Sequence, residues 1–348
     1  MKYFAVIDCG TTNSRIYLLN DNFEIINKGF KKIGVRETAI SGSNELLKQG
    51  LKEVFRKTVE DAGLEIKDIR FAITSGMITS EIGLIEIPHL WAPVGICDLA
   101  KNIKVVHDLE VFPLDVPLIF IRGIKNYFPE NATYKDIRKI DFLRGEETQM
   151  AGLLSLYPNF PLPFIVIILS SHTKYVFVTE DKKISGCLTT LSGQVYEALK
   201  KQTSVGKSII GTSKKANNYF DTNIIDTAYD VIQNVGFLRS LIMPRFMEVL
   251  LNTEWYEREL FINSAITTED LKVVNDFSLF NFSLINSYFI LVGHKQRCEI
   301  FNYMLKKYFG VKTKIKMIYE EKDIEKLSIE GAIFIARQAG YFKKALTM

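Results

Sequence analysis

Cysteine and histidine are both scarce in this sequence, with four of each among 348 residues. The cysteines lie far apart, and none is paired with another metal-ligating residue at the spacing that metal sites use. They are Cys9, Cys97, Cys187 and Cys298. His89 and His107 also lack ligand partners at metal spacing. We therefore expect four ordinary thiols in a reducing compartment, and no cysteine–histidine metal centre.

An excess of one charge and long hydrophobic runs are absent as well. Lys and Arg number 44 against 40 Asp and Glu, for a formal net charge of +4, which does not favour a nucleic-acid partner. The longest unbroken apolar run, Phe164 to Leu169, is far shorter than the roughly 20 residues that span a bilayer. The sequence opens on a strand-like run without the pattern of a signal peptide. We expect a cytoplasmic protein that binds neither nucleic acid nor membrane.

The sequence contains an internal repeat. Phe4–Ile7 and Ile16–Leu19 are short apolar runs of the kind that forms buried strands, and a loop of small polar residues joins them. Residues 163–186 have the same layout, and without gaps residues 10–13 align with residues 170–173. Each copy therefore predicts a strand, a polar loop and a second strand.

A third strand and a helical pattern follow in each copy. The third strands are predicted at residues 24–30 and 184–190, and the helices at residues 43–63 and 194–201. The chain exceeds the usual size of one domain, and 47% of its residues are hydrophobic. We predict two similar α/β domains that face each other across a central cleft, with residues 1–140 in the first and residues 141–348 in the second.

Both loops suit the phosphate chain of a nucleotide. Gly10 lets the backbone approach an anion without a Cβ in the way, and successive N–H groups in such a turn form an anion-binding concavity. Arg15 or Lys174 can add positive charge. Further donors are Thr11, Thr12, Asn13 and Ser14. For one loop alone, a plain hairpin with a capping aspartate is the simpler interpretation, but two such loops in register favour a nucleotide site.

Asp8 stands directly before the first loop. A carboxylate beside a phosphate chain is repelled unless a cation lies between the two. Asp8 therefore predicts Mg²⁺, bound through water.

These motifs carry a family resemblance. The pattern Asp-x-Gly-Thr-Thr-Asn-x-Arg at residues 8–15 resembles the first phosphate loop of the actin/hexokinase/Hsp70 superfamily. More narrowly, RGEETQ at 144–149, GMITS at 76–80, IEIPHLWAPV at 85–94 and SHTKYV at 171–176 resemble the 2-dehydro-3-deoxygalactonokinase family. The resemblance extends from Phe4 nearly to the end of the chain. It implies two RNase-H-like (actin/hexokinase-like) domains, each a mixed five-stranded sheet with flanking helices.

The resemblance also implies an activity, the transfer of the γ-phosphoryl group of ATP to the 6-hydroxyl group of 2-dehydro-3-deoxygalactonate. It implies that ATP and Mg²⁺ contact both loops and the segment ILVGHKQR at 290–297. The implied nucleotide residues are Asp8, Gly10, Thr11, Thr12, Asn13, Arg15, Ser171, His172, Thr173, Lys174, Gly293 and His294, with Asp8 at the metal. The implied sugar-acid residues are Gly76, Met77, Arg144, Gly145, Thr148 and Gln149.

The RGEETQ segment has the residue types that phosphoryl transfer needs. The reaction requires positioning, neutralised charge and an acceptor for the hydroxyl proton. Arg144 suits a carboxylate or phosphate because its planar fork makes two parallel hydrogen bonds. Glu146 or Glu147 can accept the proton, and we slightly favour Glu146. The simpler interpretation is that both glutamates complement the N-terminus of a helix.

Several positions in the second half depart from the family pattern. Ser170 and Ser171 replace a Gly-Thr pair, Gln194 replaces a glutamate, and Ser264 and His294 stand at glycine positions. Two alternatives to the implied activity therefore stay open. One is a kinase of the same fold that acts on another acidic sugar, and the other is a binding protein without catalysis. The oligomeric state is also open, a homodimer being one expectation.

Overall fold

The computed structural model describes residues 3–212 and 219–342. Contacts between Cα atoms divide the chain into two compact units. Unit 1 comprises Met1–Phe160, Asp181–Gly186 and Glu325–Met348, and unit 2 comprises Pro161–Glu180 and Cys187–Ile324. The division after residue 140 stays a prediction for where independently folding domains meet.

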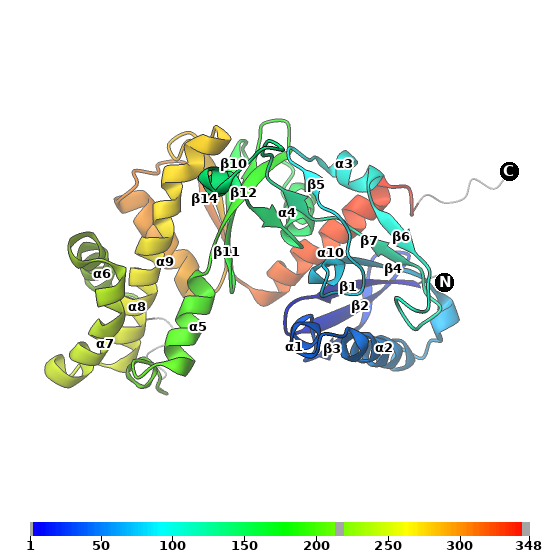
Figure 1. The fold of residues 1–348 in the computed structure, drawn as a ribbon, viewed down its shortest axis with the longest axis horizontal. Helices are drawn as coiled ribbons and strands as arrows, with labels where there is room; N and C mark the ends of the chain where they lie inside the picture. The colour runs from blue at the N-terminus through cyan, green and yellow to red at the C-terminus, as the bar shows by residue number, and fades with distance from the viewer. Residues whose placement is uncertain (1–2, 213–218, 343–348) are drawn as a thin grey trace. The chain divides into compact units, whose positions relative to one another are not determined.

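Unit 1 is built on a six-stranded sheet in the order β3-β2-β1-β4-β7-β6 (Figure 1). The strands β1, β2 and β3 pair antiparallel in sequence, β4 runs parallel to β1, and β7 runs parallel to β4. A second, small sheet has the order β5-β8-β9. The strands are β1 (Tyr3–Cys9), β2 (Ser14–Asn20), β3 (Ile25–Lys31), β4 (Ile69–Gly76), β5 (Leu90–Trp91), β6 (Lys104–Val106), β7 (Leu118–Phe120), β8 (Ile124–Lys125) and β9 (Phe142–Leu143).

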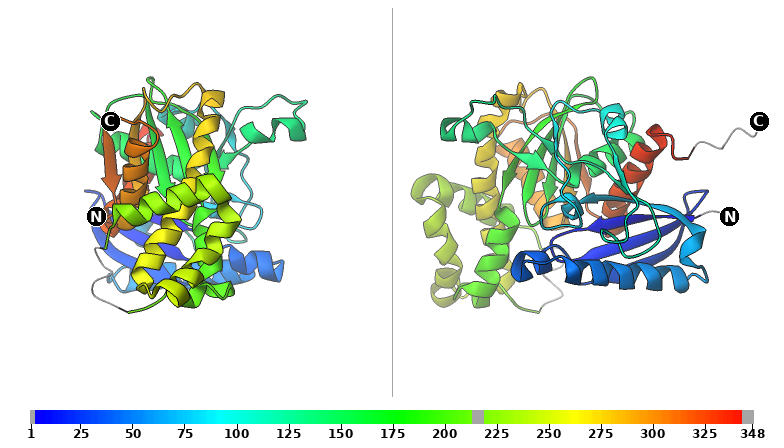
Figure 2. Two further views of the ribbon diagram at one scale, coloured as in Figure 1. Left: turned by 90° about the vertical axis from the view of Figure 1, so that its left-hand side faces the viewer. Right: turned by 45° about the vertical axis from the view of Figure 1, so that its right-hand side comes forward.

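The helix α2 covers one face of this sheet (Figure 2). Its apolar side chains Leu47, Leu51 and Phe55 are fully buried, because positions three and four apart share one helix face. The α-helices are α1 (Arg36–Ser41), α2 (Glu45–Glu60), α3 (Ile96–Lys101), α4 (Glu146–Leu156) and α10 (Glu321–Gln338, in unit 1 from Glu325 onward). The 3₁₀ helices are η1 (Ile66–Asp68), η2 (Met77–Thr79) and η3 (Tyr134–Lys139).

Unit 2 is built on a five-stranded sheet in the order β12-β11-β10-β13-β14. The strands are β10 (Phe164–Leu169), β11 (Thr173–Val178), β12 (Ile184–Thr190, of which the residues to Gly186 belong to unit 1), β13 (Tyr288–Gly293) and β14 (Ile315–Ile318). The α-helices are α5 (Ser192–Gln202), α6 (Thr222–Val235), α7 (Phe237–Leu251), α8 (Trp255–Asp270) and α9 (Lys295–Lys307), and the 3₁₀ helices are η4 (Gly206–Ser208) and η6 (Leu271–Phe280). The helices α6, α7 and α8 pack side by side (Figure 2).

The predicted repeat and the α/β class are confirmed. In each sheet the first strand pairs antiparallel with the second strand of its copy and parallel with a fourth strand. The predicted third strands correspond to β3 and β12. The second sheet has the predicted five strands, and the first carries a sixth, β6, at its edge.

Each unit has its own hydrophobic core. In unit 1, Ile7 of β1 clusters with Phe55 of α2. In unit 2, Ile167 of β10 clusters with Phe289 of β13 and Phe301 of α9. Among the described residues, no helix is both long enough and apolar enough to cross a membrane.

Two glycines let α4 and α10 cross at backbone contact within unit 1. A Cβ on Gly331 would lie 1.8 Å from the carbonyl oxygen of Thr148, and a Cβ on Gly152 would lie 2.0 Å from that of Leu327. The crossing holds α4, and with it the RGEETQ segment at its start, against α10.

Candidate functional site

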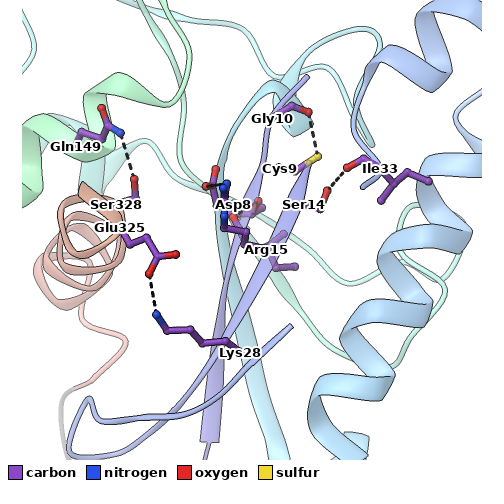
Figure 3. A network of polar contacts seen from close by, with 12 residues as sticks. Asp8, Cys9, Gly10, Ser14, Arg15, Lys28, Ile33, Gln149, Glu325 and Ser328 are labelled. Atoms are coloured by element: carbon purple, nitrogen blue, oxygen red, sulfur yellow. Dashed lines mark hydrogen bonds and ion pairs between the residues drawn. The ribbon is translucent and has the colours of Figure 1, made fainter. Parts of the chain in front are cut away.

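The first polar feature of unit 1 is the pair of residues that flanks the first loop. Asp8 near the end of β1 lies opposite Arg15 at the start of β2 (Figure 3), and their charged groups are 3.7 Å apart, with 44% of the Asp8 side chain exposed. Desolvation by the surrounding chain raises the pKa of Asp8, while Arg15 lowers it and the charge of Glu325 raises it again. A further cation beside Asp8 would thus stabilise the ionised form of its side chain.

The loop after Asp8 is held by its own backbone and by residues 34–36. The N–H of Gly10 donates to the carbonyl of Asn13 at 3.0 Å, and the carbonyls of Gly10 and Thr11 accept from the N–H groups of residues 35 and 36 at 3.2 and 2.9 Å. Gly34 makes this possible, because a Cβ there would lie 2.4 Å from the Thr11 oxygen. Thr11 and Thr12 remain exposed.

The second loop, in unit 2, is braced in the same way. A Cβ on Gly193 would lie 2.1 Å from the carbonyl oxygen of Ser170, and the N–H of Gln194 donates to the carbonyl of Ser171 at 2.8 Å. Ser171 is exposed and His172 is half-buried, with the Ser171 hydroxyl 3.2 Å from its Nδ1. The next two residues, Thr173 and Lys174, are buried in β11.

Arg297 of α9 braces this loop, a role that the sequence did not assign to it although it ends the segment at 290–297. Its guanidinium donates to the carbonyl of Ser170 at 3.1 Å, to the hydroxyl of Thr173 at 3.1 Å and to that of Ser192 at 3.0 Å. Burial lowers the pKa of Arg297, and the charge of Asp270 opposes this. The only sequence signal was its place in the first turn of the helix after Gly293.

A cavity of about 490 Å³ opens beside the second loop. It lies within unit 2, and its lining includes Gly193, which touches the loop, and His294, which the resemblance had placed at the adenosine. Gly293 itself is wedged against β10, since a Cβ there would lie 2.6 Å from the carbonyl oxygen of Leu169. The volume is in the range of small-molecule sites.

Other lining residues could not be predicted from motifs. They are Tyr196 of α5, Tyr219 before α6, and Trp255 and Asn263 of α8. Gln296 of α9, which also lines the cavity, falls within the segment at 290–297. These residues come from segments far apart along the chain, whose packing the sequence pattern does not specify.

In unit 1, the GMITS and RGEETQ segments meet at two glycines. Gly76 has φ 87° and Gly145 has φ 114°, a region that only glycine adopts readily, and a Cβ on Gly145 would lie 3.2 Å from the Cα of Gly76. Gly76 ends β4, and the register of β4 with β1 places Ser75 opposite Asp8. The predicted metal residue and the predicted sugar-acid segments are therefore neighbours in unit 1.

The guanidinium of Arg144 contacts other residues of unit 1. Its Nη1 donates to the hydroxyl of Thr79 at 2.6 Å and also to the Thr79 carbonyl, and its Nη2 lies 3.3 Å from Nδ1 of His89. Burial lowers the pKa of Arg144, which the charge of Glu147 opposes. The guanidinium thus ties the RGEETQ segment to the GMITS segment.

The two glutamates at the start of α4 differ in exposure. Glu146 is half-buried and accepts from the N–H of Arg144 at 2.9 Å. Glu147 is fully buried and accepts from the N–H of Gly145 at 2.8 and 2.9 Å. Burial raises the pKa of Glu147 to about 8, and the charge of Glu146 adds to this shift.

The remaining predicted sugar-acid residues have mixed surroundings. Thr148 is buried, and Nε2 of Gln149 donates to the Ser328 hydroxyl of α10 at 3.5 Å (Figure 3). Met77 is half-buried at the start of η2.

The family model of the 2-keto-3-deoxy-galactonokinases matches residues 8–313. The chain belongs to this family. The resemblance inferred from RGEETQ and the loop motifs is thereby confirmed. Members of this family are kinases, which are phosphotransferases with an alcohol group as acceptor.

Two relatives show how far the similarity extends. A protein of Rhizobium meliloti (strain 1021), named a probable 2-dehydro-3-deoxygalactonokinase (DgoK1), is 21% identical over 207 residues. That alignment spans 60% of this chain and 59% of the relative's own length. A crystal structure from Sinorhizobium meliloti, of a protein assigned as a 2-dehydro-3-deoxygalactonokinase, is 15% identical with a TM-score of 0.70 and covers 99% of both chains.

A third solved structure has a similar fold. Component A of (R)-2-hydroxyglutaryl-CoA dehydratase from Acidaminococcus fermentans has a TM-score of 0.50 at 11% identity, over 97% of this chain and 99% of that one. At such identities the structures show the fold alone. The predicted actin/hexokinase-like fold is confirmed.

The residues that depart from the family pattern lie in different environments. Ser264 is fully buried inside α8 and does not line the cavity, whereas His294 does. Gln194 contributes its backbone N–H to the second loop, an interaction that any residue except proline can make. Of these side chains, only His294 can touch a molecule in the cavity.

The residues near Asp8 fit an indirectly bound cation. In the described part of the chain, no group of three or more histidine, cysteine, aspartate or glutamate side chains could hold a metal ion by itself. Asp8 is a half-exposed carboxylate whose nearest cation is 3.7 Å away. Such a donor suits Mg²⁺, which keeps several of its waters and is commonly bound by one or two carboxylates together with phosphate oxygens.

Proposed function

We propose that the protein is an ATP-dependent kinase that phosphorylates 2-dehydro-3-deoxy-D-galactonate on its 6-hydroxyl group. One observation carries the proposal beyond family membership. The polar loops of the two repeats are built alike, and in each a glycine outside the loop, Gly34 or Gly193, packs on the loop's carbonyl oxygens. In this arrangement the loop carbonyl oxygens contact other parts of the protein. N–H groups and hydroxyls of the loops are left to bind phosphate.

In unit 2, the cavity would hold the nucleoside part of ATP and the second loop its phosphates. Ser171 and His172 are the predicted loop residues that reach the surface, and Arg297 holds the loop in shape through Ser170 and Thr173. The aromatic residues of the lining supply apolar surface for a base.

In unit 1, the first loop would bind phosphate oxygens, and Asp8 would hold Mg²⁺ through water. When bound, Mg²⁺ neutralises the charge on the phosphates. A Cβ on Gly10 would meet only the Asn13 oxygen, at 3.7 Å, which is an ordinary contact. The fold does not require glycine at this position, so a close approach by a ligand is the better reason for it.

The sugar acid would bind beside the junction of Gly76 and Gly145. Of the two glutamates, Glu146 is the accessible one, and we assign it as the acceptor of the hydroxyl proton. Glu147, fully buried on the N–H of Gly145, would position the segment. Arg144 would orient the same segment through Thr79.

A cytoplasmic location belongs to the same proposal. No disulfide joins the four cysteines, all of which lie in the described part of the chain, and this fits a reducing compartment. A homodimer stays a prediction.

Turnover of Mg·ATP and 2-dehydro-3-deoxygalactonate, followed as ADP release, tests the proposal. The Asp8→Asn variant should lose at least about tenfold in kcat, because the amide binds a hydrated cation more weakly than the carboxylate does. Asp61→Asn, at the exposed end of α2, is the matched control and should keep wild-type turnover.

Each of the other outcomes of this experiment would favour a different interpretation. ADP release with a different acidic sugar only would replace the substrate and keep the kinase. Bound nucleotide without turnover on any sugar acid would support a binding protein that lacks catalysis. Full turnover in Asp8→Asn would remove Asp8 from the metal site.

Exchanging each glutamate for glutamine separates their roles. Glu146→Gln should lower kcat by about 10²-fold with little change in the KM for ATP, since it removes a proton acceptor and no nucleotide contact. Glu147→Gln should keep most of the turnover. A large loss in Glu147→Gln together with a small one in Glu146→Gln would reverse the assignment.

A further inference from the structure

Two amide side chains and a backbone carbonyl form a relay along the wall of the unit 2 cavity. Nε2 of Gln296 donates to the carbonyl oxygen of Tyr219, and Nδ2 of Asn263 donates to Oε1 of Gln296, each over 3.4 Å. All three residues line the cavity. Asn263 is 9% exposed.

The hydrogen bonds of this relay fix the orientation of both side-chain amides. A backbone carbonyl oxygen can only accept, so the part of the Gln296 amide that faces Tyr219 is its NH₂ group. This turns the oxygen of Gln296 toward Asn263, which must in turn present its own NH₂ group. The oxygen Oδ1 of Asn263 remains, and it accepts no hydrogen bond from the residues that the structure describes.

We propose that this fixed acceptor makes the cavity select a 6-amino purine, adenine, over a 6-oxo purine. The inference rests on the proposed function, because it requires that the cavity binds the nucleoside part of the nucleotide. Adenine has an N–H donor at position 6, whereas guanine has only an acceptor there, and hypoxanthine has the same 6-oxo group. A 6-oxo group would place two acceptors face to face with no hydrogen between them.

The aromatic residues of the lining do not provide this discrimination. Tyr196, Tyr219 and Trp255 can stack on any purine, because every base has a π-face. The carboxylate of Glu259 already accepts the hydroxyl of Tyr196. Asn263 stands next to Ser264, the filled glycine position, in a segment that departs from the family pattern.

Binding of ADP and inosine 5′-diphosphate to the full-length protein with Mg²⁺, measured by calorimetry, tests the inference. The wild type should bind ADP about tenfold to a hundredfold more tightly, because an unpaired buried acceptor is costly. Gln296→Leu removes the anchor of the relay, and the Asn263 amide can then rotate to present its NH₂ group. The ratio of the two affinities should fall to about one, chiefly through tighter binding of the inosine nucleotide.

Two further variants complete the test. Asn263→Asp offers only acceptors and should keep the preference for ADP. Gln202→Leu, at the exposed end of α5 and outside the cavity, makes the same exchange as Gln296→Leu and should behave as the wild type. A mere loss of structure at Gln296 would weaken both nucleotides and could not improve one of them.

The failures are distinguishable. Equal affinities in the wild type, or an unchanged ratio in Gln296→Leu, would overturn the inference and leave the proposed function intact. Absence of ADP binding by the wild type would overturn the nucleotide cavity itself, and the inference with it.

Discussion

Replacing Gly331 by alanine should lower the free energy of unfolding by about 3–5 kcal/mol. The added Cβ would lie 1.8 Å from the carbonyl oxygen of Thr148, and its other neighbours are also backbone atoms. No rotamer change can relieve a clash with backbone, so α10 and α4 must move apart. The loss is measured by urea unfolding of the two proteins, followed by circular dichroism.

A matched glycine provides the control. A Cβ on Gly95 would lie 3.4 Å from a side-chain carbon of Lys183, an ordinary contact, and Gly95 has φ −98°. Gly95→Ala should therefore change the stability by less than about 1 kcal/mol. If the Gly331 and Gly95 variants are equally stable, α4 and α10 do not cross at backbone contact.

The Glu147→Gln variant should become more stable than the wild type as the pH rises. Burial raises the pKa of this carboxyl from an ordinary value of 4.5 to about 8. Between these two values the folded protein holds a proton that the unfolded chain has released. Folding stability from the neutral carboxyl is therefore fully present below pH 4.5 and is lost as the pH rises to 8.

The variant avoids this loss because glutamine stays neutral at every pH. One unit of pKa corresponds to about 1.4 kcal/mol, so the wild type should lose on the order of 4 kcal/mol across this range. Near pH 5 the two proteins should unfold at similar urea concentrations, and at pH 8 the variant should require clearly more urea.

The exposed residue Glu60 supplies a control for the removal of a carboxylate. Urea unfolding of Glu60→Gln and Glu147→Gln between pH 5 and pH 8.5 should show the trend only in Glu147→Gln. A difference from the wild type that stays constant with pH in both variants would mean that Glu147 is not buried as a neutral acid.

Local sequence patterns determined the strands, the hairpin loops and their repetition. Phe4–Ile7 and Phe164–Leu169 are short apolar runs, each followed by small polar residues, and runs of this length with such flanks favour strands. The loops and α2 followed from the same short-range rules. The family could also be recognised from local sequence, since RGEETQ and the Asp8–Arg15 pattern are each an unbroken stretch of residues.

Only the tertiary structure decided the state of the side chains in these motifs. Glu146 and Glu147 are adjacent and chemically identical, yet one is half-buried and the other is sealed from water. The contact of Arg144 with Thr79 joins residues 65 positions apart along the chain, and the two hydrogen bonds of the relay join residues 33 and 77 positions apart. Burial, pKa and hydrogen-bond polarity depend on which distant segments pack together, and a local pattern carries no record of that packing.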